Sequence, residues 1–120
     1  MKKGISLIFL LFVLLTLTNC KKEDSILKVF VRSASNQLIN GAKVIVIGDQ
    51  QSTPPTGAFV DTVFTNSSGF STINMDNYFS SSDNTTGYFD IIVKYNSKVG
   101  FGYSRCRVHS TSVETVYLEN

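Results

Sequence analysis

The residue types that support catalysis are scarce in this sequence and are not grouped in a known pattern. His109 is the single histidine, and Cys20 and Cys106 are the two cysteines. A histidine that acts as a general base needs a nucleophile and an orienting carboxylate within reach, and the spacing places neither beside His109. A zinc site needs several Cys or His ligands, which His109 and the thiol of Cys106 do not supply. We therefore predict that the protein is not an enzyme and has no catalytic residue, metal site or cofactor, with His109 exposed on a strand.

A cluster of possible oxygen ligands lies in residues 76–87, a polar segment rich in Ser, Asn and Asp. Asp76, Asn77, Asp83 and Asn84 are the ligands that this segment offers to calcium. Calcium takes about 6–8 oxygen ligands, usually with several carboxylates. Two acidic residues without regular spacing make a poor set, and Asn and Asp often form turns by bonding to nearby backbone groups. We favour the turn interpretation and predict a loop over residues 76–87.

Tyr78 and Phe79 interrupt this polar loop and are its candidate partner-binding residues. Exposed aromatic side chains on loops frequently contact partner molecules. The alternative is that both rings pack from the loop onto the core, as large aromatic residues of a small sandwich commonly do. Of these two interpretations we favour packing. Stability after replacement of both residues by Ala separates them.

The N-terminus differs in character from the rest of the chain. Lys2 and Lys3 precede an apolar run over residues 5–17 that only Ser6 and Thr16 interrupt. A basic start, an apolar run of this length and small polar residues before a junction are typical of a secretory signal. A membrane-spanning helix, the alternative, needs about 20 apolar residues. Removal of residues 1–19 leaves equal numbers of basic and acidic residues, so we predict no nucleic-acid partner.

The residues that end the signal resemble the lipobox of bacterial lipoproteins, in which a Leu and two small residues precede a lipidated Cys. Here they are Leu17, Thr18, Asn19 and Cys20, and Asn19 departs from the usual Gly, Ala or Ser. The resemblance implies cleavage before Cys20 and lipid on that residue, so the membrane would be a partner. Two or more acyl chains on one residue anchor a protein stably. A disulfide between Cys20 and Cys106 is the less favoured alternative.

The residues after Cys20 form a charged segment, which we call the tether (residues 20–25). Its members Lys21, Lys22, Glu23 and Asp24 are similar to the export tag of Bacteroidetes surface lipoproteins. That similarity implies a domain on the outer membrane that faces the cell surface. The alternatives are a solvated, flexible linker and a domain that faces the periplasm.

From residue 26 to residue 120 the sequence alternates between apolar and polar positions and is divided by turn residues. Phe89, Ile91 and Val93 share one face of the clearest strand, over residues 88–95. Seven such short segments predict an all-β fold, a single seven-stranded antiparallel β-sandwich. In the segment 101–109, Cys106 shares a face with Val108 and is predicted to be a buried thiol.

Three motifs lie in this domain, in the segments that begin at Asn40 (NGAKV), Thr65 (TNSSGF) and Tyr88 (YFDIIV). In this order they are similar to motifs of the carboxypeptidase regulatory-like domain, a prealbumin (transthyretin)-like sandwich, with Asn66 in place of the usual Asp. The likeness spans residues 27–118, and it implies a non-catalytic module, often accessory to secreted enzymes or outer-membrane receptors.

These observations predict an anchored binding or accessory module that contacts a protein or glycan through its loops, chiefly residues 49–57 and 76–87. The alternative is a structural envelope or assembly subunit that acts by pairing of an exposed β-strand.

Overall fold

The computed structural model describes residues 22–119, and strands account for most of them. The strands are β1 (Ile26–Arg32), β2 (Lys43–Gly48), β3 (Val60–Phe64), β4 (Phe70–Asn74), β5 (Thr86–Tyr95), β6 (Lys98–Arg107) and β7 (Thr111–Tyr117). One short helix, α2 (Asp76–Ser80), lies among them in the described residues. None of the helices in this part of the chain is long and apolar enough to cross a membrane.

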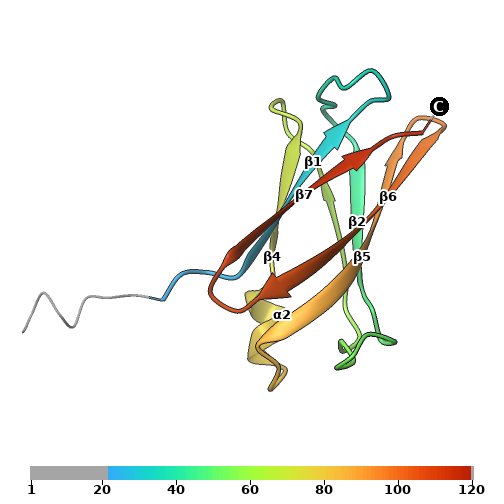
Figure 1. Ribbon diagram of the computed structural model, residues 1–120. Helices are drawn as coiled ribbons and strands as arrows, with labels where there is room; N and C mark the ends of the chain where they lie inside the picture. Colours follow the sequence, from blue (N-terminus) through green and yellow to red (C-terminus); the bar gives the residue numbers. More distant parts are fainter. Residues whose placement is uncertain (1–21, 120) are drawn as a thin grey trace, which may run out of the picture.

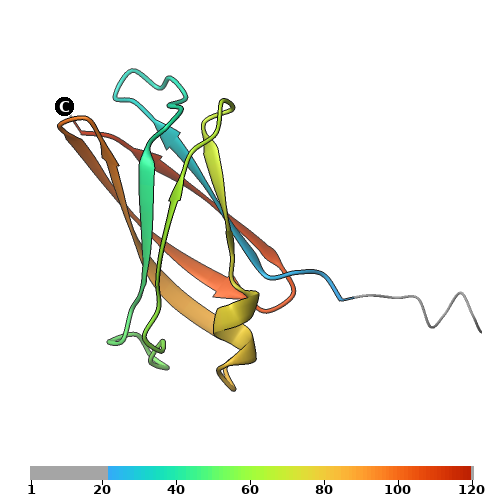
Figure 2. The ribbon, with the colours of Figure 1, turned by 180° about the vertical axis from the view of Figure 1, so that it is seen from behind.

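The strands form two sheets that pack face to face, as Figures 1 and 2 show from opposite sides. One sheet has three strands in the order β4-β1-β7, and the other has four in the order β3-β2-β5-β6. We call them the small sheet and the large sheet. The prediction of an all-β sandwich is therefore confirmed.

The expectation that every strand pair is antiparallel is wrong for β1 and β7, which run parallel from the pair Ile26 and Thr111 to the pair Arg32 and Tyr117. The short turn after β6 suggests a hairpin, but β7 crosses to the small sheet. There it joins β1, which starts at the same end of the molecule. The edges of the two sheets still touch, because Glu119 N donates to Val99 O at 2.9 Å and Ser112 Oγ donates to Arg105 O at 3.1 Å.

The core lies between the sheets and follows from the alternation of apolar residues along the strands. Leu27, Val29 and Val31 of β1 are fully buried, while the residues between them are partly exposed. In β5 the same alternation buries Phe89 and Val93. Each large apolar side chain that is removed from water contributes roughly 1.5–3 kcal/mol to folding.

The segment 76–87 is not the uninterrupted loop that its polar composition suggests. Its first residues form α2, and Tyr78 and Phe79 on that helix are 4% and 7% exposed. A helix of five residues is marginal in isolation, so tertiary packing of these two rings stabilises it. The helix was not predicted, because only Tyr78 and Phe79 of α2 are buried and the segment as a whole has a polar composition.

Strand directions place the loops at two ends of the sandwich. At the end where the tether enters β1 lie residues 49–59, α2 and the turn after β6, as Figure 1 shows. At the opposite end lie residues 33–42, the β3–β4 turn, the β5–β6 turn and the end of β7. We call these the tether end and the distal end. The two loops predicted to bind a partner therefore share the tether end.

Candidate functional site

The predicted anchor lies partly outside the described residues. Cys20 and Lys21 are not among them, whereas Lys22, Glu23 and Asp24 are exposed. These three residues lead into β1 at the tether end, beside α2 and the β6–β7 turn. An anchor attached before them would therefore leave the core between the sheets undisturbed.

Ser25 fixes the end of the tether to two other segments. Its backbone N–H donates to Asp76 Oδ1 at 2.8 Å, and its side-chain Oγ accepts from His109 N at 2.7 Å. Ser25 is fully buried, so its own N–H and hydroxyl have no solvent to replace a lost partner. The residue directly before β1 is thus bonded both to α2 and to the β6–β7 turn.

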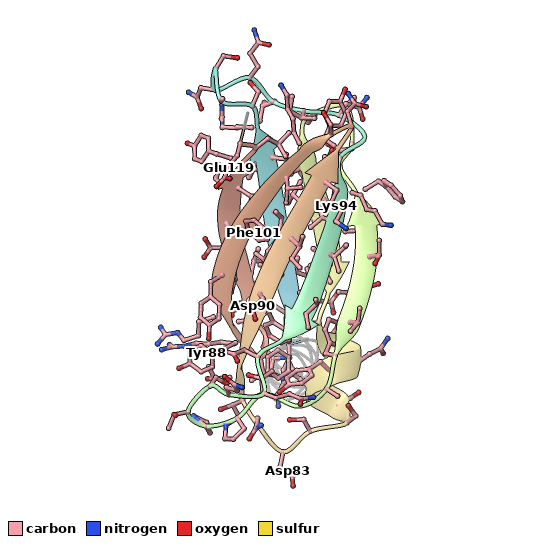
Figure 3. The ribbon with its side chains drawn as sticks, turned by 90° about the vertical axis from the view of Figure 1, so that its right-hand side faces the viewer. Asp83, Tyr88, Asp90, Lys94, Phe101 and Glu119 are labelled. Carbon is pink, nitrogen blue, oxygen red and sulfur yellow. The ribbon has the colours of Figure 1, made fainter. Side chains whose placement is uncertain are left out.

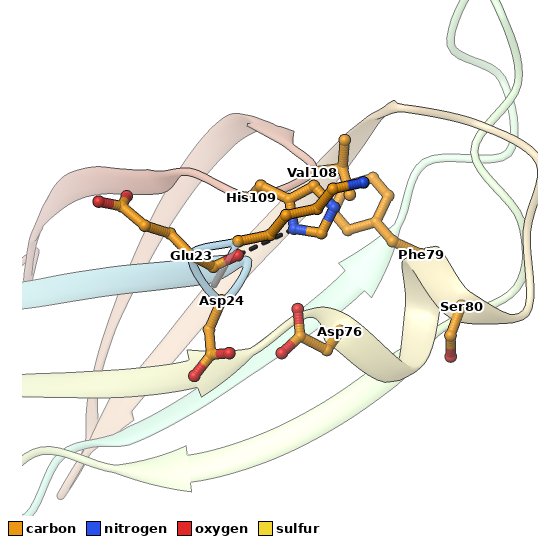
Figure 4. Close-up of a pocket in the computed structure, with 8 residues that line it drawn as sticks. Glu23, Asp24, Asp76, Phe79, Ser80, Val108 and His109 are labelled. Atoms are coloured by element: carbon orange, nitrogen blue, oxygen red, sulfur yellow. Dashed lines mark hydrogen bonds between the residues drawn. The ribbon is translucent and has the colours of Figure 1, made fainter. Parts of the chain in front are cut away.

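His109 lies in the turn between β6 and β7, so the expectation of a histidine on a strand is wrong. Its φ is +58°, a left-handed conformation, and its Nδ1 lies 2.9 Å from the carbonyl oxygen of Glu23. Figure 4 shows this contact at a hollow of about 330 Å³. The residues that line the hollow come from the tether, α2 and the turn: Lys22, Glu23, Asp24, Asp76, Phe79, Ser80, Val108 and His109. The imidazole binds the tether backbone here.

Tyr78 and Phe79 are buried. They therefore do not form the exposed contact surface that the partner-binding interpretation requires. Tyr78 packs edge-on against Phe89 with ring centres 5.2 Å apart, and its hydroxyl accepts from Gly57 N at 3.1 Å. Phe79 lies edge-on to Tyr78 at 5.1 Å. The pair closes the tether end of the core, as the packing alternative requires.

The calcium interpretation of residues 76–84 gains no support from the geometry. Asp76 Oδ1 is the acceptor for Ser25 N, and Asn84 N donates to Ser82 Oγ within the loop. Among residues 22–119, no three or more His, Cys, Asp or Glu side chains are grouped as metal ligands would be.

Cys106 is buried, with 1% of its surface exposed, on the inner face of β6. Burial raises the pKa of its thiol, and hydrogen bonds with Ser112 and Ser104 partly oppose that shift. A thiol that is protonated and buried is a poor nucleophile.

The two loops predicted to contact a partner meet around a second hollow, of about 330 Å³, at the tether end of the large sheet. Its lining is mostly polar and comes from both loops and two strands: Pro54, Asp83, Asn84, Thr85, Thr86, Tyr88 and Arg105. We call it the polar hollow. Tyr88 N donates to Thr56 Oγ1 at 2.8 Å, and Asp49 N donates to Tyr88 O at 2.9 Å. The first loop is thus bonded directly to the strand that carries Tyr88.

An aromatic pair borders the polar hollow on the outer face of the large sheet. The rings of Tyr88 and Tyr103 are stacked, with centres 6.2 Å apart and planes 25° from parallel. The Tyr103 hydroxyl donates to Asp49 Oδ2 at 2.8 Å, and this hydrogen bond raises the pKa of Tyr103 to about 12. Tyr103 is 47% exposed. The site therefore combines aromatic rings with carboxylate, hydroxyl and guanidinium groups.

The sequence offers Tyr88 and Tyr103 among the aromatic residues of a possible binding surface and predicts most of these residues to be core residues or cross-strand pairs, without pairing these two. The signal was present in the alternation of β5, because Tyr88 lies out of phase with the buried residues Phe89 and Ile91. An aromatic residue on the solvent phase of a strand is a candidate contact residue. The proximity of Asp49 to Tyr103, which lie 54 positions apart, has no counterpart in the sequence pattern.

Comparisons with known proteins show a likeness of fold. No family model matches the chain, and no curated protein matches it. Among solved structures, the Bacillus anthracis TIE protein is similar at 14% sequence identity with a TM-score of 0.53. The matched region covers 82% of this chain and 17% of that one, so this chain spans about a sixth of that protein's length. At this identity the likeness concerns the fold alone.

Proposed function

We propose that this protein is a lipoprotein of the bacterial outer membrane whose β-sandwich is a non-catalytic, glycan-binding module on the cell surface. Cleavage of the signal (residues 1–19) would expose Cys20, lipid on Cys20 would anchor the chain, and Lys21, Lys22, Glu23 and Asp24 would direct its export. The signal pattern and the lipobox resemblance support the anchor. The exposure of Lys22, Glu23 and Asp24 at one end of the sandwich is compatible with it.

We further propose that the sandwich is prealbumin-like, as the three motifs imply, with the seven strands that the alternation of apolar and polar residues predicts. Two turn geometries support this finer assignment. Gly41 and Gly69, which occupy the glycine positions of the first two motifs, both have φ of +78°. Asn66 Oδ1 accepts from Ser68 N at 2.9 Å, so Asn66 can replace the usual Asp as the acceptor in the β3–β4 turn.

The observation that carries the binding proposal is that both polar loops meet at the polar hollow beside the Tyr88–Tyr103 pair. A sugar ring has apolar C–H faces that stack on aromatic rings and hydroxyl groups at its edge. Tyr88 and Tyr103 supply the rings, while Arg105, Asp83 and Asn84 supply hydrogen-bonding groups for hydroxyls. Rigid strands hold the rings, which favours a defined contact surface over a mobile one.

The binding test uses the purified full-length chain and a panel of soluble bacterial and host polysaccharides in affinity electrophoresis. We expect retardation by at least one glycan, and loss of it in Tyr88→Ala and Arg105→Ala. Tyr117→Ala is the matched control, because Tyr117 is 54% exposed but lies on β7 of the small sheet. Retardation that persists in Tyr88→Ala and Arg105→Ala would refute a glycan site at the polar hollow.

The anchor is tested separately by the intact mass of the mature chain and by protease digestion of intact and lysed cells that carry a C-terminally tagged copy. We expect a diacylglyceryl mass on Cys20, its loss in Cys20→Ala, and digestion in intact cells. Protection until lysis would assign the domain to the periplasm. Charge neutralisation of Lys21 to Asp24 should convert digestion into protection if these residues are the export tag.

A structural role in envelope assembly is the second candidate function, and the open edge of β3 favours it. This strand lies at the edge of the large sheet, and its Val60 and Phe64 are 69% and 63% exposed. An edge strand can pair with a strand of another chain, which here would have to displace the hydrogen bond from Thr62 N to Asp61 Oδ1. Higher-order oligomers in mild detergent that disappear on replacement of Thr62 by Pro would support this role.

A further inference from the structure

The outer face of the large sheet is apolar along its middle, although it lies on the surface. The strand register aligns four residues across the sheet at this level, one from each strand: Thr62, Ile45, Ile92 and Phe101. Phe101 is 67% exposed, and Ile45 and Ile92 are partly exposed. Figure 3 shows Phe101 projecting from this face. We call these residues the middle row. Contiguous exposed apolar residues on a folded domain mark an interaction surface.

A second row flanks the middle row on the side of the distal end. It carries two positive charges between two apolar side chains: Phe64, Lys43, Lys94 and Val99. Both lysines are exposed, and Phe64 is 63% exposed.

A third row flanks the middle row on the side of the tether end. It carries a negative charge among apolar side chains: Val60, Ile47, Asp90 and Tyr103. Asp90 and Lys94 both lie on β5, two residues before and two residues after Ile92. Figure 3 shows Asp90 below and Lys94 above the level of Phe101. If a second copy is turned so that its β5 runs in the opposite direction, its Asp90 lies at the level of Lys94 in the first copy, and its Lys94 lies at the level of Asp90.

We propose that this face binds a second copy of the same chain, in a two-fold dimer whose large sheets pack face to face with their strands antiparallel. The two-fold axis would run along the middle row. Each copy would then place Lys94 opposite Asp90 of the other, and Ile92 and Phe101 would meet their own counterparts. The same rotation sets Phe64 over Val60 and Val99 over Tyr103, so apolar groups meet at the two edges of the patch. It also sets Lys43 over Ile47 of the other copy, next to Asp90 of that copy, which is the residue paired with Ile47.

The alternative two-fold arrangement, with parallel strands, is disfavoured by charge. An axis along the strands between β2 and β5 would set Lys43 of each copy over Lys94 of the other, which gives two like-charge contacts. Asp90 would then lie over Ile47 with Asp90 of the other copy beside it, whereas the antiparallel arrangement sets the oppositely charged Lys43 in that position. Face-to-face sheets keep their strand directions within about 30° of each other, a condition that the antiparallel arrangement can meet.

The size of the patch implies weak association. Rows about 7 Å apart on strands about 4.8 Å apart give a patch of roughly 400 Å². A stable interface buries about 800 Å² on each partner, so the dimer should form at high local concentration.

The antiparallel arrangement places the two tethers at opposite ends. If both chains carry the proposed lipid anchor, they would join two facing membranes, and that consequence alone rests on the proposed function.

Charge exchange tests the dimer without reference to the anchor. The full-length chain, purified in mild detergent, is measured by sedimentation velocity over a concentration series. D90K and K94D should each weaken association about tenfold or more, because both symmetric pairs become repulsive. The double variant D90K/K94D should restore it, and so should an equimolar mixture of the two single variants. A double variant that associates as weakly as the single variants would overturn the proposal.

Disulfide formation tests the register. I92C should cross-link to itself, and a mixture of D90C and K94C should cross-link to each other, each faster than T72C on the exposed outer face of the small sheet. All of these variants carry Cys20→Ser, and the buried Cys106 should contribute little background. Preferential cross-linking of K43C with K94C would indicate parallel strands and refute the arrangement. I92C that reacts no faster than T72C would refute the interface.

Discussion

Tyr103 on β6 and Asp49 in the loop after β2 are joined by a hydrogen bond of 2.8 Å from the phenol to Oδ2, across 54 positions of sequence. The bond ties the first polar loop to the outer face of the large sheet, beside Tyr88. It favours the protonated phenol, because deprotonation would place two negative charges side by side. The polar hollow and the apolar rows therefore share a border at Tyr103.

This bond gives the first prediction, a late ionisation. The ordinary Tyr pKa is 10.0, and that of Tyr103 is raised to about 12, so the phenol of the folded chain stays neutral where that of the unfolded chain ionises. The contribution of the pair to stability is thus complete below pH 10 and is lost as pH rises through about 12. In an absorbance titration at 295 nm, Asp49→Asn should move one tyrosine back toward pH 10. An identical titration curve for Asp49→Asn would contradict the assignment.

The second prediction concerns Ser25, which binds α2 and the β6–β7 turn to the start of β1. Ser25→Ala removes the acceptor of His109 N and should cost about 0.5–1.5 kcal/mol, because a part-buried hydrogen bond is lost. Denaturant unfolding followed by circular dichroism measures the change. Ser67→Ala, at an exposed turn position, should stay within about 0.5 kcal/mol of the wild type.

The third prediction distinguishes buried from exposed aromatic residues. Phe79→Ala should lower the free energy of unfolding by about 3–5 kcal/mol, because a 7% exposed ring is replaced by a cavity. Phe101→Ala removes a ring that is 67% exposed and should change stability by less than about 0.5 kcal/mol. Equal effects of the two substitutions would show that Phe79 does not pack as described.

The fourth prediction separates backbone strain from steric overlap at two glycines with the same φ of +78°. Gly41→Ala should cost about 1–2 kcal/mol, because a Cβ there meets no atom within 4 Å and only the left-handed conformation is penalised. Gly69→Ala should cost more, since its Cβ would lie 2.6 Å from Leu38 Cβ. Thermal unfolding of both variants measures the difference, and a smaller loss for Gly69→Ala would contradict it.

The fifth prediction is that Cys106 reacts slowly with thiol reagents in the folded chain. Its side chain is 1% exposed, and burial raises its pKa, so little thiolate is both formed and accessible near neutral pH. Labelling by iodoacetamide, followed by mass spectrometry, should accelerate strongly when urea unfolds the protein. Equally fast labelling without urea would place the thiol at the surface.

Much of the fold follows from the sequence, because burial on one face of a strand imposes an alternation that is visible residue by residue. The alternation of β1 and β5 and the burial of Cys106 were predicted correctly in this way. Turn residues such as Gly69 mark the boundaries because few other residues adopt a positive φ. The anchor at Cys20 stays a prediction from local pattern, since it lies outside the described residues.

Tertiary structure decided which segments meet. Pairing partners are not encoded in the period of a strand, so the parallel contact of β1 with β7 and the hydrogen bond between Asp49 and Tyr103 were not predictable. The helix α2 forms because the core accepts Tyr78 and Phe79, which overrides the turn preference of their polar neighbours. The opposite charges of Asp90 and Lys94 likewise indicate a contact surface only once the strand register places them on one exposed face, on either side of Ile92. Local preference determined the strands, and long-range packing determined the surfaces that they present.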